Sequence, residues 1–257
     1  MGVPFSSCSL FVLFSSSSSV TYPTILAFRQ QSGASRLPTF IVEESFEVRL
    51  RHAISVAWKV FARKVGGNLL PINKEASMQL QYAYLLKQLL PLILHNPDEA
   101  ADIELETGVR LPGGSSNIDI LVTGTSAKGS IKIAIEMKCY RNISSSGGPR
   151  GAQDIFQKDV YEDLQILECY VDAGIASRGL ALVMNDMPSI TQPKVKNGKY
   201  WAYDISHGFT FPGGTINVPI GGKEVCLTLK HSYSFDWSKF GDIWFTEIEG
   251  VSQSDRD

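Results

Sequence analysis

The stretch that decides the expected fold is Asn117-Ile118-Asp119-Ile120-Leu121-Val122, a turn-rich gap at 123–130, and Ile131-Lys132-Ile133-Ala134-Ile135-Glu136-Met137-Lys138. Short β-branched runs flanked by glycine are typical of neighbouring strands in a buried sheet. Because side chains alternate along a strand, Glu136 and Lys138 share one face, about 6.6 Å apart at 3.3 Å per residue. Asp119 on the neighbouring strand can then meet both of them.

Charged side chains at the end of a hydrophobic sheet lower the stability of the fold. Burying an ion costs several kcal/mol unless it is paired or binds a metal, so a strand that only needed stability would favour Val or Thr there. Two carboxylates beside a lysine suit a hard divalent cation such as Mg²⁺, which leaves positions for phosphate oxygens. The alternative is an edge-strand salt bridge between Glu136 and Lys138, with Asp119 in a turn.

The order aspartate, strand, Glu-x-Lys resembles the PD-(D/E)xK nuclease superfamily, which has the restriction-endonuclease-like fold. The pattern here reads Asn117-Ile118-Asp119 and then Glu136-Met137-Lys138, with Ile instead of Pro before the aspartate. The resemblance implies a metal-dependent phosphodiesterase that uses Mg²⁺, or Mn²⁺ in its place. It implies that Asp119, Glu136 and the backbone carbonyl of Met137 hold the metal and that Lys138 stabilises the transition state.

The element order around this motif fits the same family. Hydrophobic periodicity predicts helices at 44–65 and 73–94, strands at 102–111 and at both apolar runs, a helix from Gln153 to Gly174, and a strand at 179–184. The expected fold is therefore α/β, with an αβββαβ core over about 110 residues. Two strands joined through a helix should be parallel, which makes the sheet mixed and flanked by helices. A preceding N-terminal helix and a β-rich C-terminal extension complete it.

Each helix has residues with two interpretations. Asn73 is the expected cap of the second helix, and Glu75 in its first turn either complements the helix dipole or, as the resemblance implies, joins the catalytic site. Asp159 and Asp163 on the third helix are expected to pair with Lys158 or to lie at the surface, although that helix flanks the active cleft in the family. The first helix carries basic residues that either contact phosphates or form a solvated surface; they are Arg49, Arg51, Lys59, Arg63 and Lys64.

Two further segments could contact nucleic acid. The loop at 143–151 is rich in Ser and Gly, and Arg141 and Arg150 beside it can donate to phosphates, unless the loop is a plain connection. In the C-terminal part, strands are expected at 199–203, 224–229 and 242–248. There, three lysines stand near Tyr200 and Trp201, an arrangement that suits an unpaired strand or simply rim packing.

Composition sets the domain organisation. The 257 residues, 44% hydrophobic with a net charge of −2, fit one globular domain and argue against broad polyanion binding. The serine-rich segment 1–40 is expected to be a disordered extension, 41–250 a single nuclease-like domain, and 251–257 a disordered tail. Four scattered cysteines signal neither a zinc site nor disulfides, and the short apolar run 10–14 cannot span a membrane, so a cytoplasmic location is expected.

The sequence thus predicts a Mg²⁺-dependent nuclease that acts on DNA, without contact with a membrane. Cutting both strands of a duplex would call for a homodimer, although no heptad pattern is present. Two alternatives remain at this point. The chain is either a catalytically inactive nuclease-fold module that binds nucleic acid or a protein, or an α/β interaction domain in which the charges are structural.

Overall fold

The computed structural model describes residues 44–143 and 147–251. The expected features at 1–40, at 252–257 and in the middle of the 143–151 loop lie outside or partly outside these residues. The helical elements are α1 Phe46–Gly66, α2 Glu75–Leu89, η1 Leu90–Ile93, α3 Gln153–Asp172, α4 Pro188–Thr191 and η2 Lys199–Tyr203. The strands are β1 Ala100–Leu111, β2 Gly114–Ser126, β3 Gly129–Tyr140, β4 Arg178–Asn185, β5 Phe209–Phe211, β6 Gly214–Ile216, β7 Leu227–Leu229, β8 Tyr233–Phe235, β9 Ser238–Phe240 and β10 Ile243–Glu249.

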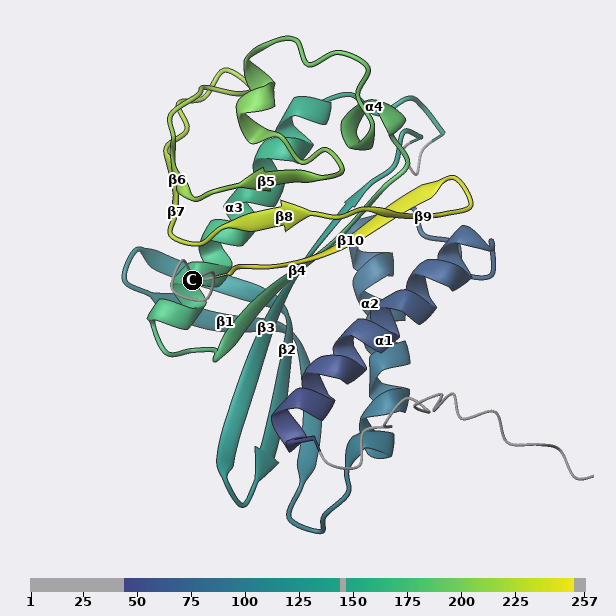
Figure 1. The fold of residues 1–257 in the computed structure, drawn as a ribbon, viewed down its shortest axis with the longest axis vertical. Coiled ribbons are helices and arrows are strands. Elements are labelled where there is room, and N and C mark those ends of the chain that lie inside the picture. The colour runs from purple at the N-terminus through teal and green to yellow at the C-terminus, as the bar shows by residue number, and fades with distance from the viewer. Residues whose placement is uncertain (1–43, 144–146, 252–257) are drawn as a thin grey trace, which may run out of the picture. The chain divides into compact units, whose positions relative to one another are not determined.

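Six strands form a mixed central sheet in the order β1-β2-β3-β4-β10-β9. β1, β2 and β3 are antiparallel neighbours, β4 runs parallel to β3, and β10 returns antiparallel to β4. Figure 1 shows α1 and α2 on one side of this sheet and α3 on the other. The predicted order of helix, three strands, helix and strand is confirmed, as is the parallel pair across the helix.

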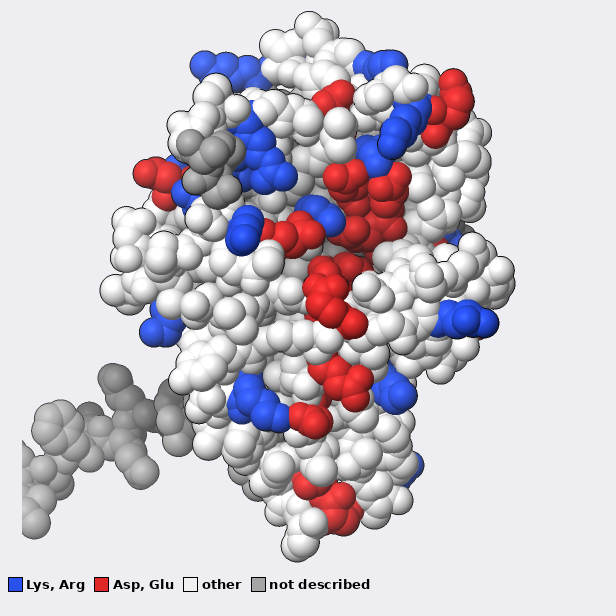
Figure 2. All heavy atoms as spheres, turned by 180° about the vertical axis from the view of Figure 1, so that it is seen from behind, with Lys and Arg blue, Asp and Glu red and all other residues white. Residues whose placement is uncertain are grey.

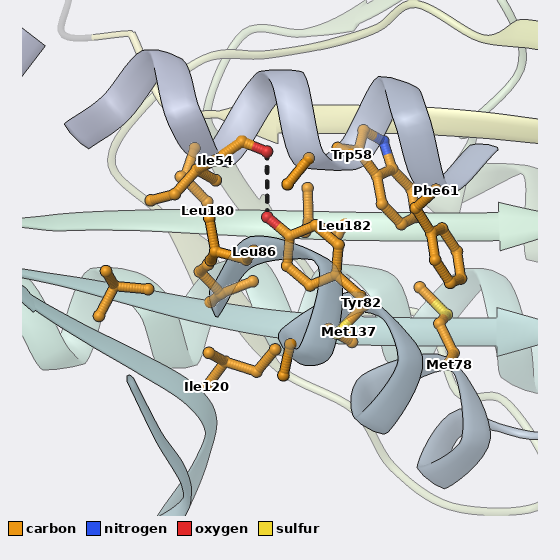
Figure 3. Packing of buried hydrophobic residues seen from close by; sticks show 14 of the residues in the cluster. Ile54, Trp58, Phe61, Met78, Tyr82, Leu86, Ile120, Met137, Leu180 and Leu182 are labelled. Atoms are coloured by element: carbon orange, nitrogen blue, oxygen red, sulfur yellow. Dashed lines mark hydrogen bonds between the residues drawn. The ribbon is translucent and has the colours of Figure 1, made fainter. Parts of the chain in front are cut away.

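The layer between α1, α2 and the sheet is apolar because each element contributes one hydrophobic stripe. The predicted stripe of α1 is buried along its whole length, and every second residue of β3 from Ile133 to Cys139 belongs to the same buried cluster. Figure 3 shows Trp58 and Phe61 of α1 facing Tyr82 of α2, whose hydroxyl donates to the Ile54 carbonyl at 3.1 Å. This bond satisfies the one polar atom of a buried tyrosine.

Alternation places the other residues of β3 on the opposite face, toward α3. Ala134 and Tyr140 pack there with Phe156, Val160 and other residues of α3. Glu136 and Lys138 have the same parity, so the prediction that they share one face is confirmed. The site therefore forms in the layer between β3 and α3.

Several boundaries differ from the sequence prediction. The N-cap of α2 is Lys74 instead of Asn73. The expected gap at 123–130 is mostly strand, since β2 continues to Ser126 and β3 begins at Gly129. The predicted strand at 199–203 is the 3₁₀ helix η2, in which the rings of Tyr200 and Trp201 lie 5.3 Å apart. Consecutive side chains on a strand would point to opposite faces, so this contact requires the helical turn.

In the C-terminal part, the strand expected at 224–229 is confined to β7, whereas the one expected at 242–248 is β10 and extends the central sheet. The short strands before β9 form two separate pairs, β5 with β8 and β6 with β7. Within residues 44–143 and 147–251, no helix is both long enough and apolar enough to cross a membrane.

Candidate active site

Asp119 of β2 lies just beyond the last residue pair between β2 and β3. The ladder between these strands ends at the pair Ile120–Ile135. One residue further, the Asp119 side chain replaces the missing backbone partner, since its Oδ2 accepts the Met137 amide hydrogen at 2.7 Å. The carboxylate is thereby fixed against the strand that carries Glu136 and Lys138.

The other neighbour of β2 is distorted at the same place. Pairs of β1 and β2 flank the position opposite Asp119, but no pair forms there with Glu106. Glu106 has φ 52°, a left-handed conformation that costs a residue other than glycine on the order of 1 kcal/mol or more. Gln79 of α2 is inserted here, and its Nε2 donates to the Asp119 carbonyl at 2.6 Å and to Glu106 Oε1 at 2.9 Å. The buried Gln79 side chain thus stabilises the opening of the sheet.

Glu136 is the most unusual group of the cluster. Its side chain lies in the layer under α3, the residue is only 7% exposed, and within the described residues its Oε1 has no hydrogen-bond partner. Burial, followed by the charges of Asp119 and Asp163, raises the pKa of Glu136 to about 9. A hydrogen bond with the Tyr170 side chain acts in the opposite direction and only partly offsets this rise in pKa. A buried carboxyl with one unpartnered oxygen and no bound cation is costly for the fold, which makes it a candidate for function.

Lys138 stands between two carboxylates from different helices. Its Nζ lies 3.4 Å from Glu75 Oε1 at the start of α2 and 3.3 Å from Asp163 Oδ2 on α3. Burial acts to lower the pKa of Lys138, but Asp163 and Glu75 outweigh it, so the pKa is raised and the ammonium stays charged. The alternative of an edge-strand bridge between Glu136 and Lys138 is wrong, because β3 is a central strand and Lys138 pairs elsewhere.

Glu75 connects α2 to the end of β3. Besides contacting Lys138, its Oε2 accepts the Cys139 amide hydrogen at 3.3 Å. The side chain is 41% exposed, so it also faces solvent at the mouth of the cluster. The sequence prediction that Glu75 lies beside the motif residues is confirmed by these contacts. Its role in catalysis stays a prediction.

The cluster contains four carboxyl groups and one ammonium, so full ionisation would give it a net charge of −3. Burial is the main cause that raises the pKa of Asp119 to about 6 and that of Asp163 to about 8. Lys138 is the cation that offsets the carboxylates of Glu75, Asp119, Glu136 and Asp163 within this group. Figure 2 shows Asp and Glu side chains gathered in the middle of one face, with Lys and Arg side chains beside them. Such an arrangement attracts a divalent cation.

The two arginines predicted to bind nucleic acid lie beyond this cluster, after the end of β3. Arg141 is paired with Asp186, at 3.1 Å between Nε and Oδ2. The Arg150 guanidinium lies over the Tyr140 ring, 5.2 Å from its centroid, and the Tyr140 hydroxyl donates to the backbone carbonyls of Arg150 and Gly151. The arginines are thus held at the rim, where Arg150 is exposed.

On α1 the expected basic face is smaller than predicted. Arg49 is buried and pairs with Glu99 at 2.6 Å, while Arg51 pairs with Glu247 and Glu249 of β10. These two arginines therefore join α1 to other elements instead of facing solvent.

Sequence reasoning missed two residues of the cluster, Asp163 and Gln79. Asp159 does pair with Lys158 at 2.8 Å, as expected, but Asp163 does not pair with Lys158 or lie at the surface. Asp163 could have been found from its position next to the apolar stripe of α3, because a carboxylate there lies against the face of β3 that carries Glu136 and Lys138. Gln79 gave no signal, because its role depends on a distortion of β1.

The chemistry of these donors fits a divalent cation. Among the described residues, no three His, Cys, Asp or Glu side chains already form a metal-binding group. Mg²⁺ does not need one, since one or two carboxylates suffice and waters and substrate phosphates occupy the other positions. The unpartnered Oε1 of Glu136 and the raised pKa values of Asp119 and Glu136 both indicate a site that positive charge would stabilise.

Comparison with known proteins adds no relative. A scan against protein-family models, a search of curated proteins and a search of solved structures each returned no match. The candidate site therefore stands on its own geometry: a mixed α/β fold in which an aspartate just beyond the β2–β3 pairing, a buried glutamate and a doubly paired lysine meet at the end of the central sheet.

Proposed function

We propose that this protein is a metal-dependent nuclease that hydrolyses phosphodiester bonds in DNA and has a restriction-endonuclease-like core. The observation that carries the proposal is the buried Glu136, whose Oε1 lacks a partner among the described residues, beside Asp119 at the opening of the sheet. The order α2-β1-β2-β3-α3-β4, with β3 and β4 parallel, supports the same proposal.

Asp119 and Glu136 would hold the metal, with the Met137 carbonyl as a further ligand. Bound Mg²⁺ supplies Lewis-acid polarisation of the phosphate and a more acidic water molecule. The chain contributes the fixed positions of the ligands. Asp119 is oriented by the Met137 amide, and its backbone is anchored by Gln79, so the ligand position is set before substrate binds.

Lys138 would act as a fixed positive charge instead of a base. Its raised pKa keeps the ammonium protonated at neutral pH, and Glu75 and Asp163 hold it from two sides. A cation at this place stabilises negative charge that develops on the phosphate oxygens in the transition state. It can also donate a hydrogen bond that orients the attacking water molecule.

One observation favours a second candidate, the catalytically inactive module. Both carboxylates that contact Lys138 are arranged as in a structural ion pair, which would leave the ammonium less available to a phosphate. In that case the same face would bind nucleic acid or a protein partner without cleaving it.

Incubation of the purified protein with supercoiled plasmid, linear duplex and single-stranded DNA separates the two. We expect cleavage with Mg²⁺ or Mn²⁺ and none with EDTA. Lys138→Met should abolish cleavage, whereas Lys132→Met, an exposed lysine on the same strand, should leave it unchanged. If both variants show the same trace of cleavage with and without metal, the protein is not a nuclease. Tight DNA binding without cleavage would favour the inactive module.

A further inference from the structure

A recess lies beyond the carboxyl end of β4, and none of its lining residues belongs to the acidic cluster. It has a volume of about 400 Å³, and Pro188, Gln192, Pro193, Val195, Tyr200 and Trp201 contribute to its lining. This volume is within the range of small-ligand sites. Its walls come from α4, η2 and the segment that joins them, and the buried Ile190 and Tyr203 anchor these two short elements in the core beside α3.

The lining combines an apolar surface with aromatic rings. The Tyr200 and Trp201 rings are 5.3 Å apart and inclined by 37°, and Val195 at the edge is 68% exposed. The Trp201 Nε1 atom is buried and has no hydrogen-bond partner among the described residues. Because this atom is buried, the support for a ligand site is the two neighbouring rings, which offer flat apolar surfaces on which a ring of a ligand can stack.

The surroundings are basic. Lys194 lines the recess, and Lys199 begins η2; both are exposed, and no ion pair joins either of them to another described residue. Lys196 is different, because it pairs with Asp204 and lies 5.5 Å above the Trp201 ring. Two available lysines beside aromatic rings are the combination that holds the backbone and bases of an unpaired strand.

The recess is connected to the catalytic end of β3. Asp186, two residues before α4, accepts the Asn142 amide hydrogen at 2.6 Å and pairs with Arg141. At the far side, the Ser189 hydroxyl donates to Gln153 Oε1 at the start of α3. Figure 1 shows α4 at the end of the molecule to which β4 leads. Lys138 precedes Arg141 by three residues, about 10 Å of extended chain.

We propose that this recess binds one unstacked base of a single-stranded nucleic-acid segment. The base stacks on the Tyr200 ring beside Trp201, and Lys194 and Lys199 contact the flanking phosphates. The inference rests on the proposed function for the class of ligand, since the strand held here would continue toward the acidic cluster. It adds a preference for substrates with an unpaired region.

The experiment measures binding of a fluorescently labelled oligo-dT strand in EDTA, by anisotropy, with the full chain. Tyr200→Leu, which keeps an apolar side chain but removes the ring, should weaken binding by about tenfold or more, because one stacked base contributes on that order. Tyr200→Phe should bind as the wild type does. Tyr84→Leu, which removes a 63% exposed tyrosine on α2, is the matched control and should also bind normally.

A strand of the same length with abasic sites separates stacking from charge. The abasic strand should bind equally to the wild type and to Tyr200→Leu, since it has no base to stack. Val195→Asp, at the exposed edge, provides a second variant if Tyr200→Leu does not fold, and it should weaken binding of oligo-dT. Equal binding of oligo-dT by Tyr200→Leu and Tyr200→Phe would overturn the proposal. Binding of a proline-rich peptide in the recess, with no binding of oligo-dT, would also overturn it.

This outcome is independent of the proposed function. Cleavage with unchanged oligo-dT binding in Tyr200→Leu would refute the base site alone. Loss of oligo-dT binding in Tyr200→Leu by a protein that never cleaves DNA would keep the base site and refute the nuclease.

Discussion

Replacing Glu136 with Gln should stabilise the metal-free protein while it abolishes cleavage. Gln has almost the same shape as Glu but does not titrate, so it removes the cost of keeping a proton on a 7% exposed carboxyl, beside Asp119 and Asp163, at a pH where the unfolded chain releases it. Residues that are kept for a reaction often lower stability in this way. The opposite signs of the two effects distinguish a functional glutamate from a structural one.

The magnitude follows from the pKa of Glu136, which rises from the usual 4.5 to about 9 in the folded chain. The difference from 4.5 to pH 7 is 2.5 pH units, and at about 1.4 kcal/mol each this gives an upper limit on the order of 3 kcal/mol at neutral pH. Local relaxation and water entry reduce it, so we expect Glu136→Gln to add about 1–3 kcal/mol.

The sign depends on pH. Because the folded pKa is raised, the favourable contribution of Glu136 is complete below pH 4.5 and is lost as the pH rises toward 9. Urea unfolding in EDTA at pH 4.5 and pH 8 should therefore show nearly equal stabilities at the lower pH and a more stable variant at the higher pH. The raised pKa values of Asp119 and Asp163 also lower the stability of both proteins as the pH rises, by the same amount in each.

Glu168→Gln is the matched control, because Glu168 is equally buried, at 6% exposure, but is fully hydrogen-bonded. It accepts the amide hydrogens of Lys230 and His231 and the hydroxyl of Tyr233. Its replacement should destabilise the fold by about 1–3 kcal/mol. If Glu136→Gln instead destabilises the metal-free protein at pH 8, as Glu168→Gln does, then Glu136 is a structural residue.

Three further predictions concern the supports of the site and the fold. Lys138→Met leaves Glu75 and Asp163 without their cation and should cost about 1–3 kcal/mol in urea unfolding at pH 8, but less at pH 5, where the Asp163 carboxyl is protonated. Gln79→Leu removes the donor to the Asp119 carbonyl and should lower the rate of cleavage about tenfold or more in steady-state assays while the far-ultraviolet circular dichroism stays unchanged. Gly66→Ala places a Cβ against the Phe240 carbonyl oxygen, closer than van der Waals contact, and should lower stability by about 1–3 kcal/mol without altering the metal dependence of cleavage.

Most of the central sheet could be predicted from the sequence because its signals are local. The alternating run that ends in Glu136 and Lys138 determines which residues of β3 face α3, and the apolar stripe of α1 is buried as expected. Helix ends were also readable, since Gly67 caps α1 and Gly174 follows α3 in a left-handed conformation.

The rest depends on contacts between distant segments. The partner of Lys138 on α3 is Asp163, which cannot be distinguished from Asp159 by spacing alone. The distortion at Glu106 goes together with the insertion of Gln79 where the pairing of β1 and β2 is interrupted. Neither a glutamate nor a glutamine at these positions predicts it. In the C-terminal part, tertiary packing decided the outcome for Lys199–Tyr203, where aromatic residues favoured a strand by propensity but form a turn of 3₁₀ helix.

The most direct measurement is a calorimetric titration of Mn²⁺ into the metal-free protein at pH 7.5, with the wild type, Glu136→Gln and Glu168→Gln compared. We expect saturable binding of one or two ions to the wild type and to Glu168→Gln, with release of a proton as the Glu136 carboxyl ionises, whereas Asp119, with a pKa of about 6, is already ionised at this pH. Glu136→Gln should lose this binding. Equal binding by Glu136→Gln and the wild type, or no saturable binding by either, would contradict the claim that these carboxylates form a metal site.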